Sequence, residues 1–371
     1  GQRVGIFARA GVGKSTLLGQ ITRGTEADVV VACLVGERGR EVRDFVEDTV
    51  GDAMSRTVLV AATSDRSPLE RLTAPWVAIT IAEHFQAQGK NVLLVVDSIT
   101  RFAHAAREVG LAAGEPPTVR GYPPSFFATV PQLLARMGRL QSGSITGLLT
   151  VLVDGDEDDD PVADALRGLL DGHISLSPEL ARSGHYPAID VLDSLSRLMP
   201  KLADKPHQAR ARAIRELLAA FRDGRDLVDV GAYQPGSNRL LDMALERMPM
   251  IEAFLRQDVD DPTALEETVA VLSLIVEDDE EIRLVLRYAL EDEGYRVLEA
   301  ANGEQALVLG QDEDPDVLLV DLRLPGIHTG GYGRWIGRGQ VFTYRSWVNW
   351  PLNENISSAV HARRMSSTAS R

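Results

Sequence analysis

The stretch Ala8-Arg-Ala-Gly-Val-Gly-Lys-Ser15 decides the fold class. Residues 2–7 before it predict a short strand, and the apolar residues after it have helical spacing: Leu17, Leu18 and Ile21. In such a turn, backbone N–H groups point at phosphate, a Lys reaches the β and γ oxygens and a hydroxyl binds Mg²⁺. These roles fit Gly11, Gly13, Lys14 and Ser15, although Ala8 replaces the usual first Gly. The alternative is a chance glycine-rich turn, which the flanking strand and helix disfavour.

The residues that follow repeat the alternation of strand and helix. Apolar, β-branched runs predict buried strands at residues 29–35, 56–62 and 91–97. Between Pro75 and Gly89, apolar residues at helical spacing predict a helix. Strands without polar alternation are typical of a parallel sheet covered on both faces, so we expect an α/β fold.

Two carboxylates follow predicted strands, at the edge where ligands of open α/β sheets bind. Asp97 ends the run 92–96, where a carboxylate can orient the water shell of Mg²⁺. Glu37 follows strand 29–35, next to Arg38, and is a candidate general base. The alternatives are a helix N-cap for Asp97 and a solvated loop acid for Glu37. Because the turn and both carboxylates occur in the expected order, we favour a nucleotide phosphate site.

Charge divides the chain into three segments. The 39 Lys and Arg against 54 Asp and Glu give a net charge of −15, which argues against binding nucleic acid by broad phosphate neutralisation. Residues 272–328, with 15 acidic and 4 basic side chains, carry −11, residues 329–371 carry +5, and residues 1–271 carry −9. These differences predict segments of different origin.

The single cysteine, Cys33, excludes an internal disulfide and favours a reducing, cytosolic setting. No apolar run approaches the roughly 18 residues that a membrane span needs. Residue 1 is Gly and opens directly into the strand-like run, so we expect a cut edge there.

Beyond residue 205 the periodicity changes. From Pro206 an amphipathic helix is predicted by four apolar residues at helical spacing, Ile214, Leu217, Leu218 and Phe221. A second strand-first pattern begins at Leu272, with expected strands at 272–276, 295–298 and 317–320 and a helix that carries residues 282–289. Residues 329–371 hold three of the four Trp and sustain no period, so we expect a disordered tail.

The chain resembles the ATPases of flagellar and type III protein export, which are related to the catalytic subunits of rotary ATP synthases. The resemblance covers about residues 1–271 and is carried by residues 1–7, 11–18, 34–42, 94–103, 115–125, 171–177 and 185–197. The sequences Pro-Pro-Thr at 116–118 and His-Tyr-Pro-Ala-Ile-Asp at 185–190 favour the export branch over ATP synthases and RNA-translocating transcription terminators.

The resemblance implies a Mg²⁺-dependent ATPase with a RecA-like P-loop core and a C-terminal helical part. It implies that Glu37 polarises the attacking water, that Lys14 and Arg38 hold phosphate charge, and that Ser15 and Asp97 bind Mg²⁺. The residues that match the family's nucleotide contacts are Gly11, Val12, Gly13, Lys14, Ser15, Thr16 and Tyr186.

Two of the matched residues keep an alternative. Tyr186 would pack on adenine, or it is a packed turn aromatic beside Pro187. Arg197 would reach the nucleotide of a neighbouring subunit in a homo-hexamer, or it caps the preceding helix. An arginine supplied in trans meets charge that develops in the transition state, so activity would depend on assembly.

The resemblance also implies partners and location. It implies export apparatus proteins, export substrates and chaperones as partners, no nucleic acid, and a bacterial cytoplasmic location with peripheral association at the inner membrane as an option. The ATPase core would span residues 1–205 and its helical part residues 206–271. Flagellar and injectisome export stay open as alternatives.

The sequence departs from the family at Arg9 and in the segment ahead of the P-loop strand. Arg9 stands where the family has a small residue, and we expect its side chain to point outward. The small β-barrel domain that precedes the P-loop strand in the family has no counterpart here, so we expect either that the sequence is a fragment or that ring assembly is impaired. The acidic run 154–160 matches a family loop and is expected to be solvated.

Residues 272–328 resemble the receiver domain of two-component response regulators, a flavodoxin-like fold, over about its first half (βαβαβ). The matching positions are Glu277 and Asp278 for Mg²⁺ and Asp321 as phosphoacceptor. A receiver also needs a Lys near the phosphoryl group, and the last Lys of this chain is Lys205. We therefore expect a partial receiver that does not switch.

The leading interpretation is ATP hydrolysis that energises protein export. The alternatives are a receiver-containing signalling fusion and a non-functional truncated gene fusion, with residues 329–371 as out-of-frame or unselected coding.

Overall fold

A computed structural model describes residues 1–153, 160–276, 317–320 and 340–343 of the chain. The chain divides into two compact units. The first comprises Gly1–Glu246 and Leu255–Ala264, and the second comprises Arg247–Phe254 and Leu265–Arg371. Among the described residues, no helix has both the length and the apolar character needed to cross a membrane.

The first unit is built on an eight-stranded sheet with the order β3-β2-β4-β6-β1-β7-β8, to which β5 is added beside β6. The strands are β1 (Arg3–Ala8), β2 (Val29–Val35), β3 (Thr57–Ala62), β4 (Asn91–Asp97), β5 (Gly138–Arg139), β6 (Ser144–Leu152), β7 (Gly172–Leu176) and β8 (Ile189–Ser196). All neighbours from β3 to β7 are parallel, whereas β8 runs antiparallel to β7 and β5 antiparallel to β6. The predicted parallel sheet is therefore confirmed.

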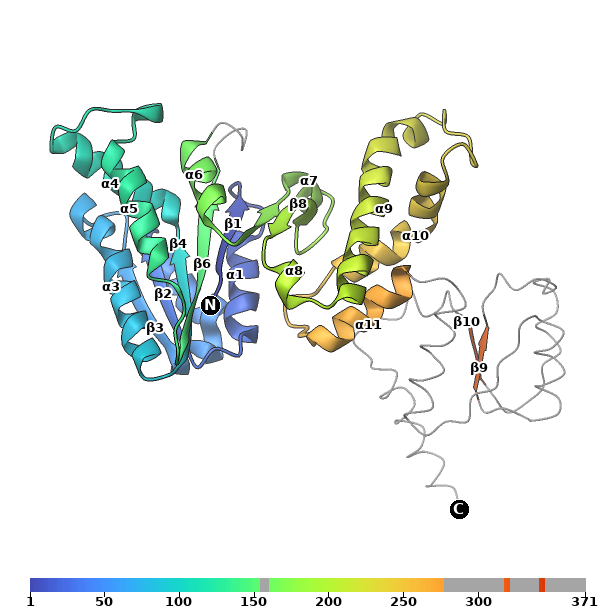
Figure 1. Cartoon of the computed structure of the whole chain (residues 1–371), viewed down its shortest axis with the longest axis horizontal. Coiled ribbons are helices and arrows are strands. Elements are labelled where there is room, and N and C mark those ends of the chain that lie inside the picture. Colours follow the sequence, from blue (N-terminus) through green and yellow to red (C-terminus); the bar gives the residue numbers. More distant parts are fainter. Residues whose placement is uncertain (154–159, 277–316, 321–339, 344–371) are drawn as a thin grey trace, which may run out of the picture. The chain divides into compact units, whose positions relative to one another are not determined.

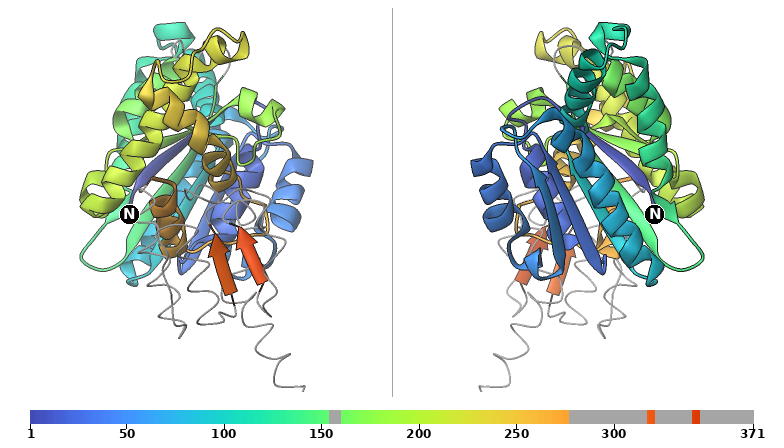
Figure 2. Two further views of the ribbon diagram at one scale, coloured as in Figure 1. Left: turned by 90° about the vertical axis from the view of Figure 1, so that its right-hand side faces the viewer. Right: turned by 90° about the vertical axis from the view of Figure 1, so that its left-hand side faces the viewer.

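Helices cover both faces of this sheet (Figures 1 and 2). One face packs against α3 (Pro68–Ala87), α4 (Ile99–Ala112), α5 (Pro124–Ala135) and α6 (Pro161–Leu169). The other face packs against α1 (Lys14–Gly24) and the π-helical turn η1 (Phe45–Val50), which follows α2 (Gly39–Asp44). Alternate residues of β2 enter the two cores, with Val31 and Cys33 in one and Val30 and Ala32 in the other. A strand buried on both faces needs apolar residues at every position, which explains its unbroken apolar sequence.

Strands 29–35 and 91–97 match their predicted bounds, and the predicted strands at 2–7 and 56–62 are each shifted by one residue at their start. The helix expected from Pro75 instead begins at Pro68. Ser67 and Glu70 form a capping box there, and Pro75 lies inside the helix. The cap decides the start of this helix because it satisfies N–H groups that have no partner within the first turn.

Smaller elements complete the first unit. They are η2 (Gly51–Arg56), η3 (Val119–Gly121), α7 (Pro178–Arg182) and α8 (Met199–Leu202). The predicted amphipathic helix is α9 (Lys205–Asp229), and α10 (Arg239–Leu255) follows it and continues into the second unit. Ile214 and Leu217 of α9 are buried, as their spacing predicts.

The prediction of a strand at residues 272–276 was wrong. These residues end helix α11 (Leu265–Val276), where Leu272 and Ile275 are buried one turn apart. Within the second unit, Arg247 Nη1 donates to the carbonyl of Ile275 at 2.6 Å and so satisfies one of the free carbonyls at the helix end. A short apolar run fits a strand and a buried helix equally well, so the local sequence does not decide between them.

The second unit also contains β9 (Val317–Val320), as predicted, paired in parallel with β10 (Gln340–Thr343). The strand β10 lies in the segment expected to be a disordered tail, and this part of that prediction was wrong. Several predicted features lie outside the described residues. They are the strand 295–298, the helix at 282–289, the acidic residues 154–159, and Glu277, Asp278 and Asp321.

Candidate functional site

The glycine-rich turn connects the end of β1 to the first residue of α1, Lys14. Gly13 has a φ of 91°, a left-handed conformation that costs a residue with a Cβ atom free energy. A Cβ at this position would lie in ordinary van der Waals contact with the Tyr186 ring, at 3.5 Å, so the backbone conformation and not the lack of space favours glycine. The turn thus needs glycine here, and it places Lys14 and Ser15 in the first turn of the helix.

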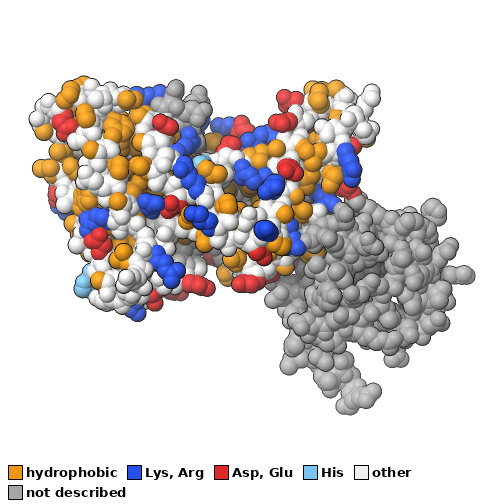
Figure 3. Space-filling view, in the orientation of Figure 1, with side chains coloured by type: hydrophobic (Ala, Val, Ile, Leu, Met, Phe, Trp, Pro, Cys, Tyr) orange, Lys and Arg blue, Asp and Glu red, His pale blue; other side chains and the backbone are white. Residues whose placement is uncertain are grey.

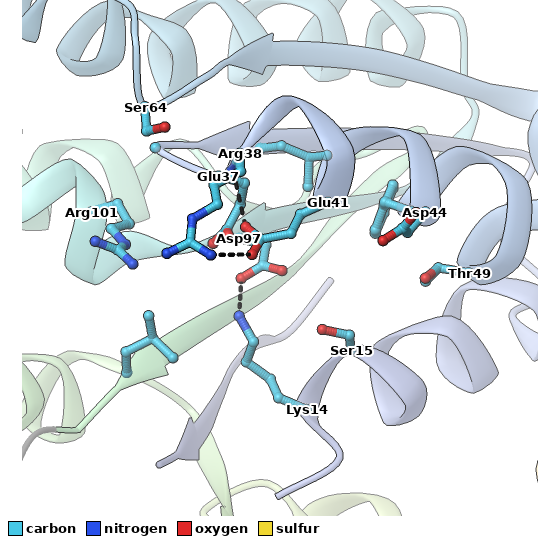
Figure 4. Close-up of a pocket in the computed structure, with 14 residues that line it drawn as sticks. Lys14, Ser15, Glu37, Arg38, Glu41, Asp44, Thr49, Ser64, Asp97 and Arg101 are labelled. Carbon is cyan, nitrogen blue, oxygen red and sulfur yellow. Dashed lines mark hydrogen bonds and ion pairs between the residues drawn. The ribbon is translucent and has the colours of Figure 1, made fainter. Parts of the chain in front are cut away.

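A cavity of about 560 Å³ lies beside this helix, at the carboxyl ends of β2 and β4 (Figure 4). It is lined by residues that the sequence places far apart: Lys14, Ser15, Glu37, Arg38, Glu41 and Asp97. Five of these six were predicted from the sequence as site residues, and the parallel order of the strands brings them together.

Lys14 Nζ forms an ion pair with Asp97 Oδ1 at the base of this cavity. Asp97 is 5% exposed, and Thr150 Oγ1 donates to the same carboxylate oxygen at 2.6 Å. A buried carboxylate requires such partners because its transfer from water is costly. The helix N-cap of α4 is Ser98, whose Oγ accepts from the backbone N–H of Arg101. The alternative role of Asp97 as that cap is therefore excluded.

Glu37 extends into the cavity from the turn after β2. Its pKa is raised to about 7, chiefly by burial and then by a side-chain hydrogen bond with Glu41 and the negative charge of Asp97, while Lys14 acts to lower it. The carboxyl group is half-buried, so it is not the freely solvated loop acid of the alternative interpretation. A carboxyl group with a pKa near neutral pH can both accept and release a proton under working conditions.

Glu41 is the carboxyl group to which Glu37 is hydrogen-bonded. Its Oε2 accepts from the backbone N–H of Arg38 at 3.0 Å, and this bond, with that from Glu37, lowers the pKa of Glu41. The side chain of Arg38 is 82% exposed and lies 3.9 Å from Glu41 Oε1. The shared proton therefore resides on Glu37, while the Arg38 guanidinium is accessible to a ligand.

The remaining predicted residues lie around the turn or away from the cavity. Thr16 is exposed and Val12 is buried in the core. Tyr186 is 47% exposed and stands over Gly13. Arg197 does not line the cavity, and its Nη2 donates to the carbonyl of Arg167 in the last turn of α6 at 3.1 Å.

Five lining residues with polar or charged side chains were not predicted as site residues: Glu41, Asp44, Thr49, Ser64 and Arg101. Ser64 could have been found, because it follows β3 at the same sheet edge as Glu37 and Asp97. Arg101 lies one turn after Asp97, and its stem would be 3.1 Å from a Cβ at Gly36, which has a φ of 72°. Nothing in the local sequence marks Thr150, which reaches Asp97 from β6.

Three family models match consecutive parts of the chain. The nucleotide-binding domain of the ATP synthase alpha/beta family matches residues 1–196, and the C-terminal domain of the type III secretion ATPase EscN matches residues 203–273. The response regulator receiver domain matches residues 273–333.

Curated relatives agree with the first two matches. The "Flagellum-specific ATP synthase" of Bacillus subtilis (strain 168) is 50% identical over 281 residues, which are 76% of this chain and 64% of the relative. The "Type 3 secretion system ATPase" of Xanthomonas euvesicatoria is 52% identical over 279 residues, or 75% and 63% of the two chains. The chain thus spans less than two thirds of the length of these relatives.

Solved structures show the same similarity. The assembled ATPase EscN from the type III secretion system of enteropathogenic E. coli has a TM-score of 0.71 and 46% identity, covering 75% of this chain and 67% of that one. A second structure, of a prototypical type III secretion ATPase from pathogenic bacteria, has a TM-score of 0.69 and 46% identity, covering 74% and 80%. The chain therefore belongs to the ATP synthase alpha/beta family, among the flagellum-specific and type III secretion ATPases.

Proposed function

We propose that the protein hydrolyses ATP and that this activity energises flagellar or type III protein export. The observation that carries the proposal is the cavity in which Lys14, Asp97 and Glu37 meet. A cation for phosphate, a buried carboxylate and a base with a pKa of about 7 are what phosphoryl transfer to water requires.

Glu37 in its ionised form orients and polarises the attacking water. Lys14 holds the β and γ phosphate oxygens, and the exposed Arg38 guanidinium closes on the phosphates from the other side. In the structure Lys14 is paired with Asp97, so binding of ATP exchanges that carboxylate for phosphate oxygens as the partner of Lys14. The remaining nucleotide contacts are assigned to the turn residues Gly11, Val12, Gly13, Ser15 and Thr16, with Tyr186 over adenine.

The donor set fits Mg²⁺ as the cofactor. The Ser15 hydroxyl and the Asp97 carboxylate line one cavity, and both are hard oxygen ligands of the kind that Mg²⁺ takes together with phosphate oxygens. Mg²⁺ bound there would neutralise phosphate charge, and Thr150 would keep Asp97 oriented toward it.

We further propose that Arg197 acts in trans within a homo-hexamer. Its exposure, and its absence from the cavity of its own chain, support this assignment. The related EscN was solved in an assembled form and in complex with its central stalk EscO. By extension, this chain would work at the cytoplasmic face of a bacterial export apparatus, with export substrates and chaperones as partners. Its ATPase core would be residues 1–205 and its helical part residues 206–271.

The test is ATP turnover by the purified chain and by Lys14→Ala and Glu37→Gln. We expect both substitutions to lower turnover by at least 100-fold, the scale that groups acting on transition-state charge contribute. Lys90→Ala, which removes an exposed lysine away from the cavity, is the matched control and should leave turnover unchanged. Equal rates in all four proteins would refute the proposal, and light scattering with and without ATP measures the assembly.

A phosphorelay function is the second candidate, favoured by the receiver match at residues 273–333. It requires that a small phosphodonor phosphorylate Asp321 and that Asp321→Asn abolish the product, with Glu277 and Asp278 holding Mg²⁺. Two observations argue against it: the chain has no Lys after Lys205, and Leu272–Val276 belong to helix α11. A non-functional gene fusion predicts neither ATP turnover nor phosphorylation.

A further inference from the structure

The strand that leads to Arg197 is interrupted by a bulge. His173 of β7 pairs with Leu195 of β8, and Ser175 pairs with Asp190. Residues 191–194 of β8 therefore oppose only Ile174 and leave the ladder of backbone hydrogen bonds. A bulge bends its strand and changes the direction in which the following residues leave the sheet. Arg197 comes three residues after this bulge. Leu195 and Ser196 pair with β7 again, and the backbone N–H of Arg197 donates to the carbonyl of Asp171 at 2.9 Å, so the conformation of the bulge sets the register in which the end of β8 rejoins the sheet.

The carbonyl groups that the bulge releases are bound by one side chain from α9. Arg215 Nη1 donates to the carbonyls of Val191 and, at 3.2 Å, of Ser194, and its Nη2 donates to Leu192 at 3.0 Å. Backbone carbonyls outside a ladder need such partners. The planar guanidinium, with donors in a fixed fork, can serve three of them at once, which a lysine ammonium on its flexible stem does less well.

The other contacts of the bulge come from the sheet or from α9. Ser175 Oγ donates to the carbonyl of Asp193 at 3.2 Å, within β7 and β8. Arg222 lies two turns after Arg215 on α9, and its Nη2 pairs with the carboxylate of Asp190 at 2.7 Å. The Arg222 side chain is 50% exposed, and exposed ion pairs contribute little to stability. Arg222 also pairs with Asp193 of the bulge at 3.3 Å, but through side chains alone, whereas Arg215 binds the backbone carbonyls that the bulge releases.

We propose that Arg215 is a positioning residue for the trans arginine. By binding the carbonyls of the bulge, it holds the end of β8 and thereby the direction of Arg197, so that the position of α9 controls the transition-state contact in the neighbouring subunit. This inference rests on the proposed function of Arg197.

The experiment compares Arg215→Met with the matched control Arg212→Met. Basic side chains gather on the visible face over β8, α8 and α9 (Figure 3), and Arg212 is an exposed member of α9 three residues before Arg215. With ATP as substrate, we expect Arg215→Met to lower kcat by about 10- to 100-fold, the effect of a misplacement of about 1 Å, with KM unchanged. Arg215→Lys should show an intermediate loss, and Arg212→Met should show none.

A double-mutant comparison tests whether Arg215 acts through Arg197. In an Arg197→Ala background, Arg215→Met should cause no further loss of kcat, because the group that it positions is gone. A full additional loss there, or a kcat of Arg215→Met equal to that of Arg212→Met, would overturn the inference.

Hydrogen exchange gives a readout that does not depend on turnover. We expect the peptide that covers residues 191–198 to exchange faster in Arg215→Met than in Arg212→Met, while the peptide of β2 is unchanged. Equal exchange of residues 191–198 in both variants would contradict the role of Arg215 even in an inactive chain. Turnover that is absent or independent of Lys14 would contradict the proposed function instead.

Discussion

The pair formed by Glu37 and Glu41 leads to a specific pH dependence. Glu37 must be ionised to act as the base, and its pKa is raised to about 7. At pH 6 only about one molecule in eleven carries the ionised base, so kcat/KM, which reports the free enzyme, should fall about tenfold from its alkaline plateau. This fall of kcat/KM toward acid pH, the acid limb of the pH profile, should be absent in Glu37→Gln.

Replacing Glu41 by Gln should shift this limb. Burial is the largest cause of the raised Glu37 pKa and stays, but the hydrogen bond with the Glu41 carboxylate and its negative charge are removed. A loss of about one pKa unit would raise the ionised fraction at pH 6 from about one in eleven to about one half, a gain of roughly fivefold in relative kcat/KM. The assay is steady-state ATP turnover from pH 5.5 to 8.5, with each variant normalised to its own plateau.

Asp44→Asn is the control for the charge change. Asp44 lines the same cavity but pairs with Arg40 at 3.7 Å and makes no hydrogen bond with Glu37. We expect its acid limb to stay near pH 7. The role of Glu41 in raising the Glu37 pKa is refuted if Glu41→Gln leaves the acid limb in place or if Asp44→Asn shifts it equally. The role of Glu37 as the base is refuted if Glu37→Gln retains the acid limb.

Three further predictions concern stability. Folding raises the pKa of Glu37 from 4.5 to about 7, so the folded protein favours its neutral form. The stability that this group contributes is present below pH 4.5 and is lost as the pH rises through 7. Glu37→Gln should therefore have a higher Tm than the wild type at pH 8 and an equal Tm at pH 4. Thr150→Val removes the 2.6 Å hydrogen bond to the Asp97 carboxylate without changing the shape of the side chain, and should lower the free energy of unfolding by about 1.5–3 kcal/mol in urea titrations. Phe7→Ala, at a fully buried position of β1, should lower it by about 3–5 kcal/mol in the same titrations, and a loss below about 1 kcal/mol would contradict its place in the core.

Local patterns in the sequence predicted most of the first unit. The apolar run Val29–Val35 and the run that ends in Asp97 gave the strands, because a strand buried on both faces shows no polar alternation. The glycines of the turn marked the start of α1, since few other residues adopt their conformation. The predicted start of α3 was wrong because the helix is capped by Ser67, eight residues before Pro75, and Pro75 lies inside it.

The sequence by itself determined the class of fold, the phosphate-binding turn and the two carboxylates of the site, because these depend on the periodicity and conformational preferences of neighbouring residues. Only the tertiary structure decided which groups meet. It paired Lys14 with Asp97, brought Thr150 to the same carboxylate, and placed Arg215 under the bulge of β8. It also made Leu272–Val276 the end of a helix, in which Leu272 and Ile275 are buried one turn apart. Contacts between residues far apart in the chain depend on strand order and helix packing, which no local pattern contains.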